Sequence, residues 1–193
     1  MTRAQQRERT RAALLDVGRR LFATHGYAEV GLAEIVREAG VTKGALYHHF
    51  PGGKTDLFRG VLAQVQAGVA AAVVATADAE DGPWARLAAG CRAFLTASTD
   101  PAVRRIMLVD GPAVLGWSEW RAMDEAESTS HLADALAALV DAGIIVRQPV
   151  APLTRLLSGA MNEAALWLAE TGGPGDLEDV LTALSRMLQA LRA

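Results

Sequence analysis

Residues 31–50 read GLAEIVREAGVTKGALYHHF, and this stretch contains two short helical patterns joined by a tight turn. Glycine at position 40 can end the first helix, because it tolerates a positive φ angle. Thr42 is a candidate N-cap for the second helix, which stops before Pro51. The first helix has one apolar face, with residues at the i, i+3, i+4 and i+7 spacing: Leu32, Ile35, Val36 and Ala39.

The second short helix combines a narrow inward face with a thin outer face. Leu46 and Phe50, four residues apart, form the inward stripe. A helix with such a thin, donor-bearing outer face can lie in the major groove of DNA. The alternative is an ordinary helical hairpin in a protein core, which the small and polar face disfavours. The remaining positions are small or hydrogen-bonding: Lys43, Gly44, Ala45, Tyr47 and His48.

The flanking sequence extends this pair into a three-helix headpiece over residues 10–50. An amphipathic helix precedes the pair and ends at Gly26, and another is expected from about Thr55 to Ala77. Further along, a break is expected at 110–112 and a long helix from Trp117 to Ala142. Strand-type alternation is nearly absent. We therefore predict an all-α protein of about nine helices, with residues 1–54 forming a helix-turn-helix DNA-binding domain and residues 55–193 a helical domain for ligand binding and dimerisation.

The distribution of charge agrees with that division. The whole chain of 193 residues has a formal net charge of −3, which alone argues against general nucleic-acid binding. Residues 1–54, however, hold nine Lys/Arg and five Asp/Glu, whereas residues 55–193 hold ten and seventeen. A basic head on an acidic body is typical of a DNA-reading domain joined to a regulatory domain, although such asymmetry also arises by chance.

Several classes of protein lack support in the sequence. The single cysteine, Cys91, excludes an intramolecular disulfide and is expected to be buried filler. The polar N-terminus predicts no signal peptide, and the absence of about 18 consecutive apolar residues predicts no membrane span, so we expect a cytoplasmic protein. There is no glycine-rich phosphate loop, HExxH motif or Cys/His metal spacing. We expect no metal or cofactor, and an enzyme is the remote alternative.

The segment ALLDVGRRLFATHGYAEVGLAEIVREAGVTKGALYHHF (residues 13–50), followed by GGKTDLF, resembles the N-terminal domain of the TetR (tetracycline-repressor) family of transcriptional regulators. The resemblance covers roughly residues 10–62. It implies a homodimeric repressor that binds a palindromic operator in double-stranded DNA and is released by a small-molecule effector. Gly31 departs from the family, which usually has Ser or Thr there, and this puts a helix cap and a phosphate contact in doubt.

The resemblance also assigns roles on the DNA. Lys43, Gly44 and Ala45 would face the bases, while Tyr47 and Lys54 would hold phosphates. The arginines at positions 3, 7 and 9 would either form an arm on the DNA or lie in a disordered tail. The full set of expected DNA-binding residues is Thr42, Lys43, Gly44, Ala45, Tyr47, His48 and Lys54.

The last two expected helices carry clear apolar stripes. These stripes could form an intramolecular hairpin, but the resemblance favours two such hairpins forming a four-helix bundle in a homodimer. A two-fold dimer would read two half-sites about 34–36 Å apart. The expected dimerisation residues are Leu157, Met161, Ala164, Leu181, Leu184 and Leu188.

An aromatic and polarisable set occupies the middle of the second domain. It could line an apolar ligand cavity or pack as solid core. Few charges interrupt these segments, so a neutral or weakly polar effector is expected. The alternative is a DNA-binding regulator with no effector. The expected ligand-binding residues are Phe94, Met107, Trp117, Trp120, Met123 and Trp167.

Overall fold

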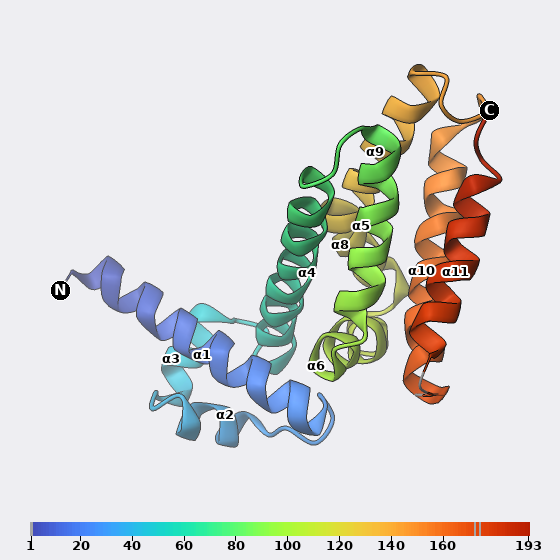
Figure 1. The fold of residues 1–193 in the computed structure, drawn as a ribbon. Helices are drawn as coiled ribbons and strands as arrows, with labels where there is room; N and C mark the ends of the chain where they lie inside the picture. The colour runs from blue at the N-terminus through green and yellow to red at the C-terminus, as the bar shows by residue number, and fades with distance from the viewer. Residues whose placement is uncertain (1, 172, 174) are drawn as a thin grey trace. The chain divides into compact units, whose positions relative to one another are not determined.

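A computed structural model describes residues 2–171, 173 and 175–193, apart from the side chains of residues 127, 128 and 171. Every named element in this part of the chain is helical, which confirms the all-α prediction (Figure 1). Two short π-helical turns, η1 and η2, continue the α-helices on either side of them. In chain order the elements are α1 (Arg3–His25), α2 (Leu32–Glu38), α3 (Lys43–His49), α4 (Lys54–Asp78), α5 (Pro83–Ser98), α6 (Pro101–Arg104), η1 (Arg105–Asp110), α7 (Gly111–Leu115), α8 (Trp117–Asp124), η2 (Glu125–Thr129), α9 (Ser130–Asp141), α10 (Val150–Thr171) and α11 (Asp176–Gln189).

The chain packs as two compact units that interleave in the sequence. The first unit contains the residues up to Val65 together with Arg105–Arg121, and the second contains Gln66–Arg104 and Ala122–Ala193. Packing therefore groups the start of α4 and a distant segment with the helix-turn-helix. The functional boundary expected at residue 54 remains a prediction.

Aromatic and aliphatic side chains from α1, α2, α3 and α4 fill the core of the first unit. Phe22 and Phe58 are fully buried and meet edge to face, with 5.3 Å between ring centroids, an arrangement that aromatic pairs favour. Ile35 from α2 and Leu46 from α3 are fully buried as well, and Phe50 is 4% exposed. The inward stripe predicted for α3 is thus confirmed.

The segment Arg105–Arg121 packs around one tryptophan. The side chain of Trp120 is 3% exposed, and its indole N–H donates to the carbonyl oxygen of Met107 over 2.7 Å. Gly111 lies directly against the ring, because a Cβ atom there would come within 2.8 Å of Trp120 Cδ1 and 3.2 Å of the Ile106 carbonyl oxygen. Glycine is therefore the residue that this close approach requires.

Polar contacts join this segment to the helix-turn-helix part of the same unit, including one from Arg105 Nη1 to the carbonyl oxygen of Thr24 over 3.4 Å. The backbone N–H of Tyr27 donates to Asp110 Oδ2 over 2.8 Å. Arg59, in the second turn of α4, pairs with Glu119 of α8. The first unit therefore includes residues far along the chain that no local sequence pattern connects to α1–α4.

The break expected at 110–112 is absent. The chain passes from η1 directly into α7, and the helical run ends instead at Gly116, which has a φ of 80°. Pro112 sits in the first turn of α7, where a missing backbone N–H costs little. The break therefore moves to the next glycine.

The second unit is a helical bundle of α5, α9, α10 and α11 with the later part of α4 and the end of α8. The helix expected from Trp117 to Ala142 is present as the continuous run α8–η2–α9, with a π-turn that the sequence pattern did not indicate. The core of the second unit is formed chiefly by leucine side chains that recur along its helices. The fully buried members include Leu95, Leu136 and Leu139.

By length and composition, α4 qualifies as a candidate membrane span, whereas the sequence predicted none. This is weak evidence, because the core helix of a globular protein passes the same test. Leu57, Phe58, Val61 and Leu62 of α4 are fully buried in the first unit. The start of the helix therefore packs against protein.

Candidate DNA-binding surface and effector cavity

The α2–turn–α3 arrangement follows from three local features. Gly40 has a φ of +65° and reverses the chain after α2. The Thr42 hydroxyl oxygen then accepts a hydrogen bond from the backbone N–H of Ala45 over 3.1 Å, which caps α3 as predicted. On the other side of α3, Leu46 is held in the core. The cap at the start of α3 and the burial of Leu46 together orient the remaining side chains of the helix outward.

The expected base-facing residues lie on the accessible side of α3. Lys43, Gly44 and His48 are exposed, Ala45 is half-buried, and Tyr47 is 42% exposed. A Cβ atom on Gly44 would meet nothing nearer than the hydroxyl of Thr42 at 3.9 Å. Glycine is thus not required there by packing within the protein.

The start of α2 has the weak cap that the sequence indicated. Gly31 occupies the N-cap position in an extended conformation, with φ −86° and ψ 145°, and supplies no side-chain hydrogen bond. A Cβ atom there would meet nothing within 4 Å. The backbone and the space would both accept a serine or threonine.

Lys54, expected to hold a phosphate, is also tied to its own domain. Its ammonium donates to the carbonyl oxygens of Tyr27 and Val30, each over 2.9 Å, and lies 4.1 Å from the centroid of the Tyr27 ring. These contacts connect the start of α4 to the turn after α1. Sequence reasoning missed this anchoring role, because the carbonyls belong to a loop more than twenty residues away.

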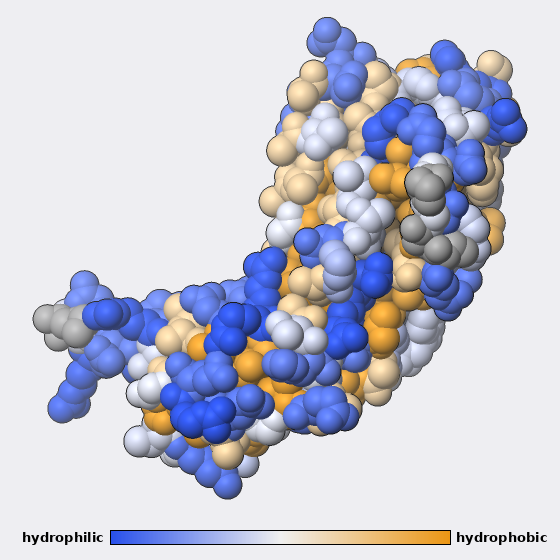
Figure 2. All heavy atoms as spheres, turned by 60° about the horizontal axis from the view of Figure 1, so that its bottom comes forward, coloured by the Kyte–Doolittle hydropathy of each residue, from blue (hydrophilic) through white to orange (hydrophobic). Residues whose placement is uncertain are grey.

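The N-terminal arginines lie on a helix instead of a loose tail. A capping box between Thr2 and Gln5 starts α1 at Arg3. Figure 2 shows the projecting start of α1 as hydrophilic. Arg7 and Arg11 are four residues apart and therefore share one face of α1.

This arginine face lies next to the end of α3. The guanidinium of Arg11 is 5.6 Å from the centroid of the Phe50 ring. Burial lowers the pKa of His49, and the positive charges of His48, Arg7 and Arg11 lower it further. The contact between Arg11 and Phe50 places this face of α1 beside the end of α3.

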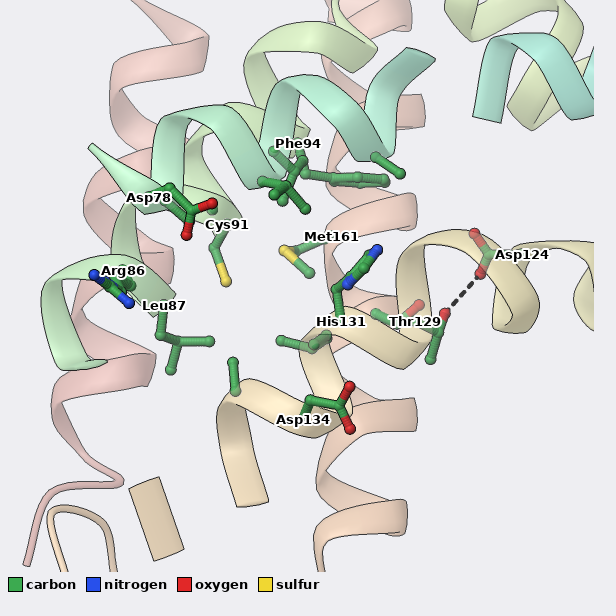
Figure 3. A pocket seen from close by; sticks show the side chains of 18 residues that line it. Asp78, Arg86, Leu87, Cys91, Phe94, Asp124, Thr129, His131, Asp134 and Met161 are labelled. Atoms are coloured by element: carbon green, nitrogen blue, oxygen red, sulfur yellow. Dashed lines mark hydrogen bonds between the residues drawn. The ribbon is translucent and has the colours of Figure 1, made fainter. Parts of the chain in front are cut away.

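The second unit encloses a cavity of about 420 Å³. Figure 3 shows Leu87, Cys91, Phe94 and Met161 around the space. Burial raises the pKa of the Cys91 thiol to about 12, in line with its expected role as buried filler. The described lining consists of Ala70, Val73, Val74, Ala77 and Asp78 from α4; Arg86, Leu87, Gly90, Cys91 and Phe94 from α5; Asp124 from α8; Thr129 from η2; His131, Leu132, Asp134 and Ala135 from α9; and Ser158 and Met161 from α10.

Of the six residues expected to bind a ligand, Phe94 belongs to this lining and the other five are not among its described members. Met107 and Trp120 are buried in the first unit, where they bond to each other. Trp117 is 66% exposed and stacks near Trp120, with 5.0 Å between ring centroids. Trp167 of α10 is 43% exposed, and Met123 is half-buried.

The sequence signal that marks this cavity is small residues, not aromatic ones. Ala70, Val73 and Ala77 share one face of α4, and Gly90 and Cys91 lie on α5. Short side chains on facing helices leave unfilled volume between the helix axes. The other aromatic residues expected at the cavity, Trp117, Trp120 and Trp167, are not among its described lining.

The expected dimerisation residues lie mainly in the core of the single chain. Leu157, Met161, Leu184 and Leu188 are 3–7% exposed within one chain, and Ala164 and Leu181 are half-buried. The outward faces of α10 and α11 carry other apolar side chains instead. These are Leu156, Trp167 and Met187, which are 72%, 43% and 51% exposed.

Comparison with known proteins identifies the family. Residues 14–61 match the profile of bacterial regulatory proteins of the tetR family, and residues 84–191 match that of a tetracyclin repressor-like C-terminal domain. The chain belongs to the TetR family. The expected resemblance is confirmed and extends well beyond the helix-turn-helix.

Two relatives match this chain over short stretches of sequence. The HTH-type transcriptional regulator LmrA of Bacillus subtilis is 48% identical over 48 residues, which is 25% of this chain and 26% of LmrA. AcrR of Shigella flexneri is 48% identical over 54 residues, or 28% of this chain and 25% of AcrR. The matched region thus spans about a quarter of each relative. This TetR-family chain is a DNA-binding transcriptional regulator.

Solved structures match along the whole chain. A TetR-family transcriptional regulator from Pectobacterium atrosepticum superposes with a TM-score of 0.83 at 32% identity, covering 100% of this chain and 98% of that one. RolR, solved in complex with resorcinol, has a TM-score of 0.73 at 22% identity, covering 96% of this chain and 90% of RolR. At 22% identity, the likeness to RolR shows a shared fold and nothing more.

Proposed function

We propose that this TetR-family chain is a homodimeric repressor that binds a palindromic operator and leaves it when a small molecule occupies the cavity of the second unit. The observation that carries the proposal is the outer face of α3, where exposed Lys43, Tyr47 and His48 are backed by buried Leu46. A donor-bearing helix held rigidly by its opposite side is what base readout in a major groove needs. Its setting is expected to be the cytoplasm, and its role regulatory, not enzymatic.

Genomic footprinting of the full chain tests operator recognition. Bound sites are expected to contain inverted half-sites whose centres lie about 34–36 Å apart. Lys43→Ala should alter base preference within each half-site, because Lys43 faces the bases in this proposal. Binding without sequence preference, or to single half-sites at full affinity, would contradict the proposal.

The proposed dimer uses the outward faces of α10 and α11. Leu156, Trp167 and Met187 are large apolar side chains that one chain leaves accessible, and a second copy would cover them. Gly159 is exposed on α10, and its lack of a side chain would allow the helices of a second copy to approach closely. We therefore propose a contact surface made of these residues in place of the six expected from the sequence.

A pair of charge substitutions separates the interface from the core. Leu156→Asp with Met187→Asp should give a folded monomer by sedimentation, with strongly reduced operator affinity. Leu184→Asp, which places a charge at a 7% exposed position inside the protomer, should instead unfold the bundle. A double variant that remains a dimer with unchanged operator affinity would exclude this surface.

The cavity supports the effector part of the proposal. Its volume of about 420 Å³ lies within the about 300–1,000 Å³ of typical small-molecule sites. RolR, which shares the fold, binds resorcinol. A small-molecule screen read by calorimetry and by release of operator DNA should find compounds that do both. If ligands bind in the cavity without changing operator affinity, the regulator works without an effector at this site.

A further inference from the structure

Two fully buried polar side chains of the second unit have no hydrogen-bond partner among the described residues. They are Gln66 of α4 and Ser98 at the end of α5, called here the Gln66–Ser98 pair. A serine in a helix often donates to the carbonyl oxygen four residues earlier, but the Ser98 hydroxyl makes no such bond to Phe94. A buried donor or acceptor without a partner costs free energy, so such groups usually meet a water molecule or a ligand.

The two side chains of the pair lie at the same level of α4 and α5. A Cβ atom on Gly90 of α5 would come within 3.4 Å of Val73 Cγ2's partner methyl, Cγ1, so the two helices are in contact there. They run in opposite directions, because only residues 79–82 join them. Gln66 is seven residues before Val73 and Ser98 is eight residues after Gly90. Each therefore lies about 10–12 Å from that contact, in the same direction.

The cavity ends one helical turn before the Gln66–Ser98 pair. Residues four apart share one face of a helix, and the described lining includes two such rows. On α4 the row is Asp78, Val74, Ala70 and then Gln66, and on α5 it is Arg86, Gly90, Phe94 and then Ser98. Gln66 and Ser98 are not among the described lining, but each lies where a row of lining residues would continue.

The turn of lining nearest the pair is apolar, since it consists of Ala70 and Phe94. The ionisable members of the described lining are Asp78, Arg86, Cys91, Asp124, His131 and Asp134. Figure 3 shows Phe94 and Asp134 on opposite sides of the space, with the imidazole of His131 reaching into it from α9. A polar group placed beyond Phe94 therefore meets an amide and a hydroxyl, neither of which carries a charge.

We infer that the Gln66–Ser98 pair is the hydrogen-bonding end of the effector site, and that the effector is an uncharged amphiphile whose polar head, such as a hydroxyl group, both donates and accepts. The inference rests on the proposed effector role of the cavity. A hydroxyl group can accept from the Gln66 amide and donate to the Ser98 oxygen. A charged head is disfavoured, because neither side chain could neutralise it in the protein interior.

The apolar body of such a molecule would occupy the cavity itself. Leu87, Cys91 and Met161 surround this space (Figure 3). The ring of Phe94, which is 8% exposed, must turn aside for the head to reach the pair, and side-chain changes of this kind are common on binding. The site then combines apolar walls with one neutral, polar end, which is the usual composition of a small-molecule site.

Three probes of one shape test the assignment: 3-phenylpropan-1-ol, butylbenzene and 3-phenylpropylammonium, which end in a hydroxyl, a methyl and an ammonium group. NMR titration of the full-length protein measures their affinities. The alcohol is expected to bind about tenfold or more tighter than the ammonium. It should also move the side-chain amide signal of Gln66 downfield, as a new hydrogen bond does, whereas butylbenzene should not. That signal is identified by its loss in Gln66→Leu.

Substitutions assign the preference for a hydroxyl group to the pair. In Gln66→Leu, the ratio of alcohol affinity to butylbenzene affinity should fall about tenfold, because the hydroxyl loses a partner while the apolar walls remain. Binding of butylbenzene also shows that the variant is folded. Ser98→Ala should lower the ratio in the same direction. Gln64→Leu, the same change at an exposed position of α4, is the matched control and should leave the ratio unchanged.

The outcomes separate the polar subsite from the effector role. If the ammonium binds wild-type protein as tightly as the alcohol, or if the ratio is the same in Gln66→Leu and Ser98→Ala as in wild type, the pair holds only trapped water and the assignment is wrong.

Fluorescence anisotropy of labelled operator DNA, measured in parallel, should show release by the alcohol at the concentrations at which it binds. If the alcohol binds at the pair without releasing operator, the subsite stands and the effector role fails. If none of the probes binds while operator binding is intact, both are overturned. The wild-type ranking of alcohol and ammonium decides the charge of the ligand even if a variant fails to fold.

Discussion

The helix-turn-helix and the cavity differ in how far apart in the sequence their determinants lie. In α2 and α3, the cap, the turn glycine and the inward residues all fall between residues 31 and 50. The cavity draws its lining from α4, α5, α8, η2, α9 and α10, over about ninety residues of chain. A site built from neighbouring residues can be predicted from local spacing, whereas a site built by distant helices depends on which faces of those helices meet.

The largest expected effect concerns Trp120, which the sequence suggested as a ligand contact and the structure buries in the first unit. Trp120→Ala should lower the free energy of unfolding by about 3–5 kcal/mol, through lost packing and a lost hydrogen bond to Met107. Chemical denaturation without ligand measures this effect. Trp117→Ala is the control, since that side chain is 66% exposed and should change stability by no more than about 0.5 kcal/mol. Equal effects of the two substitutions would contradict the structural role of Trp120.

A second test concerns Lys54, whose side chain bonds to a loop distant in the sequence and is also expected to hold a phosphate. Lys54→Ala should lower stability by about 1–3 kcal/mol, because the carbonyls of Tyr27 and Val30 lose a charged donor. It should also weaken operator and random DNA by the same factor and lower the salt dependence by about one charge. Denaturation and DNA titration at several salt concentrations measure both effects. A changed base preference would show that Lys54 does not act through phosphate.

The arginine face of α1 allows a finer comparison within one helix. Arg7→Gln should reduce the slope of log affinity against log salt by about 0.9, since Arg7 shares one face of α1 with Arg11, which contacts Phe50 at the end of α3. Arg9→Gln is the matched control, because Arg9 lies with Gln5, Glu8 and Ala12 on a different face of α1. The control should change the slope less. Equal slopes for the two variants would mean that the basic face is not aligned with DNA.

The smallest expected effect concerns Gly31. Gly31→Ser places a hydroxyl at the N-cap of α2, in open space and with a backbone that accepts it, so stability should rise by a few tenths of a kcal/mol, about 0.3. The same hydroxyl should tighten DNA binding modestly if this end of α2 faces a phosphate. Gly31→Ala provides the size of the side chain without the cap. A serine variant no more stable than the alanine variant would show that the cap does not form.

Prediction from the sequence succeeded where one face of a helix was enough. The Leu46–Phe50 stripe, the Thr42 cap and the turn at Gly40 all have the predicted roles. Prediction was weaker for the leucine stripe of α10 and α11, because an apolar face does not say whether it covers its own bundle or a second chain. Leu184 and Leu188 proved to be interior, while Leu156 and Met187 remain exposed.

The sequence by itself determined the helical class, the helix-turn-helix and the family, since these depend on spacing, capping and turn residues that act within a few residues of one another. The tertiary structure alone decided which side chains surround the cavity. It buried Trp120 beside Gly111 and brought Asp78, Asp124 and Asp134 to one space. The physical reason is that packing between distant helices depends on shape and volume, which periodicity along one helix does not encode.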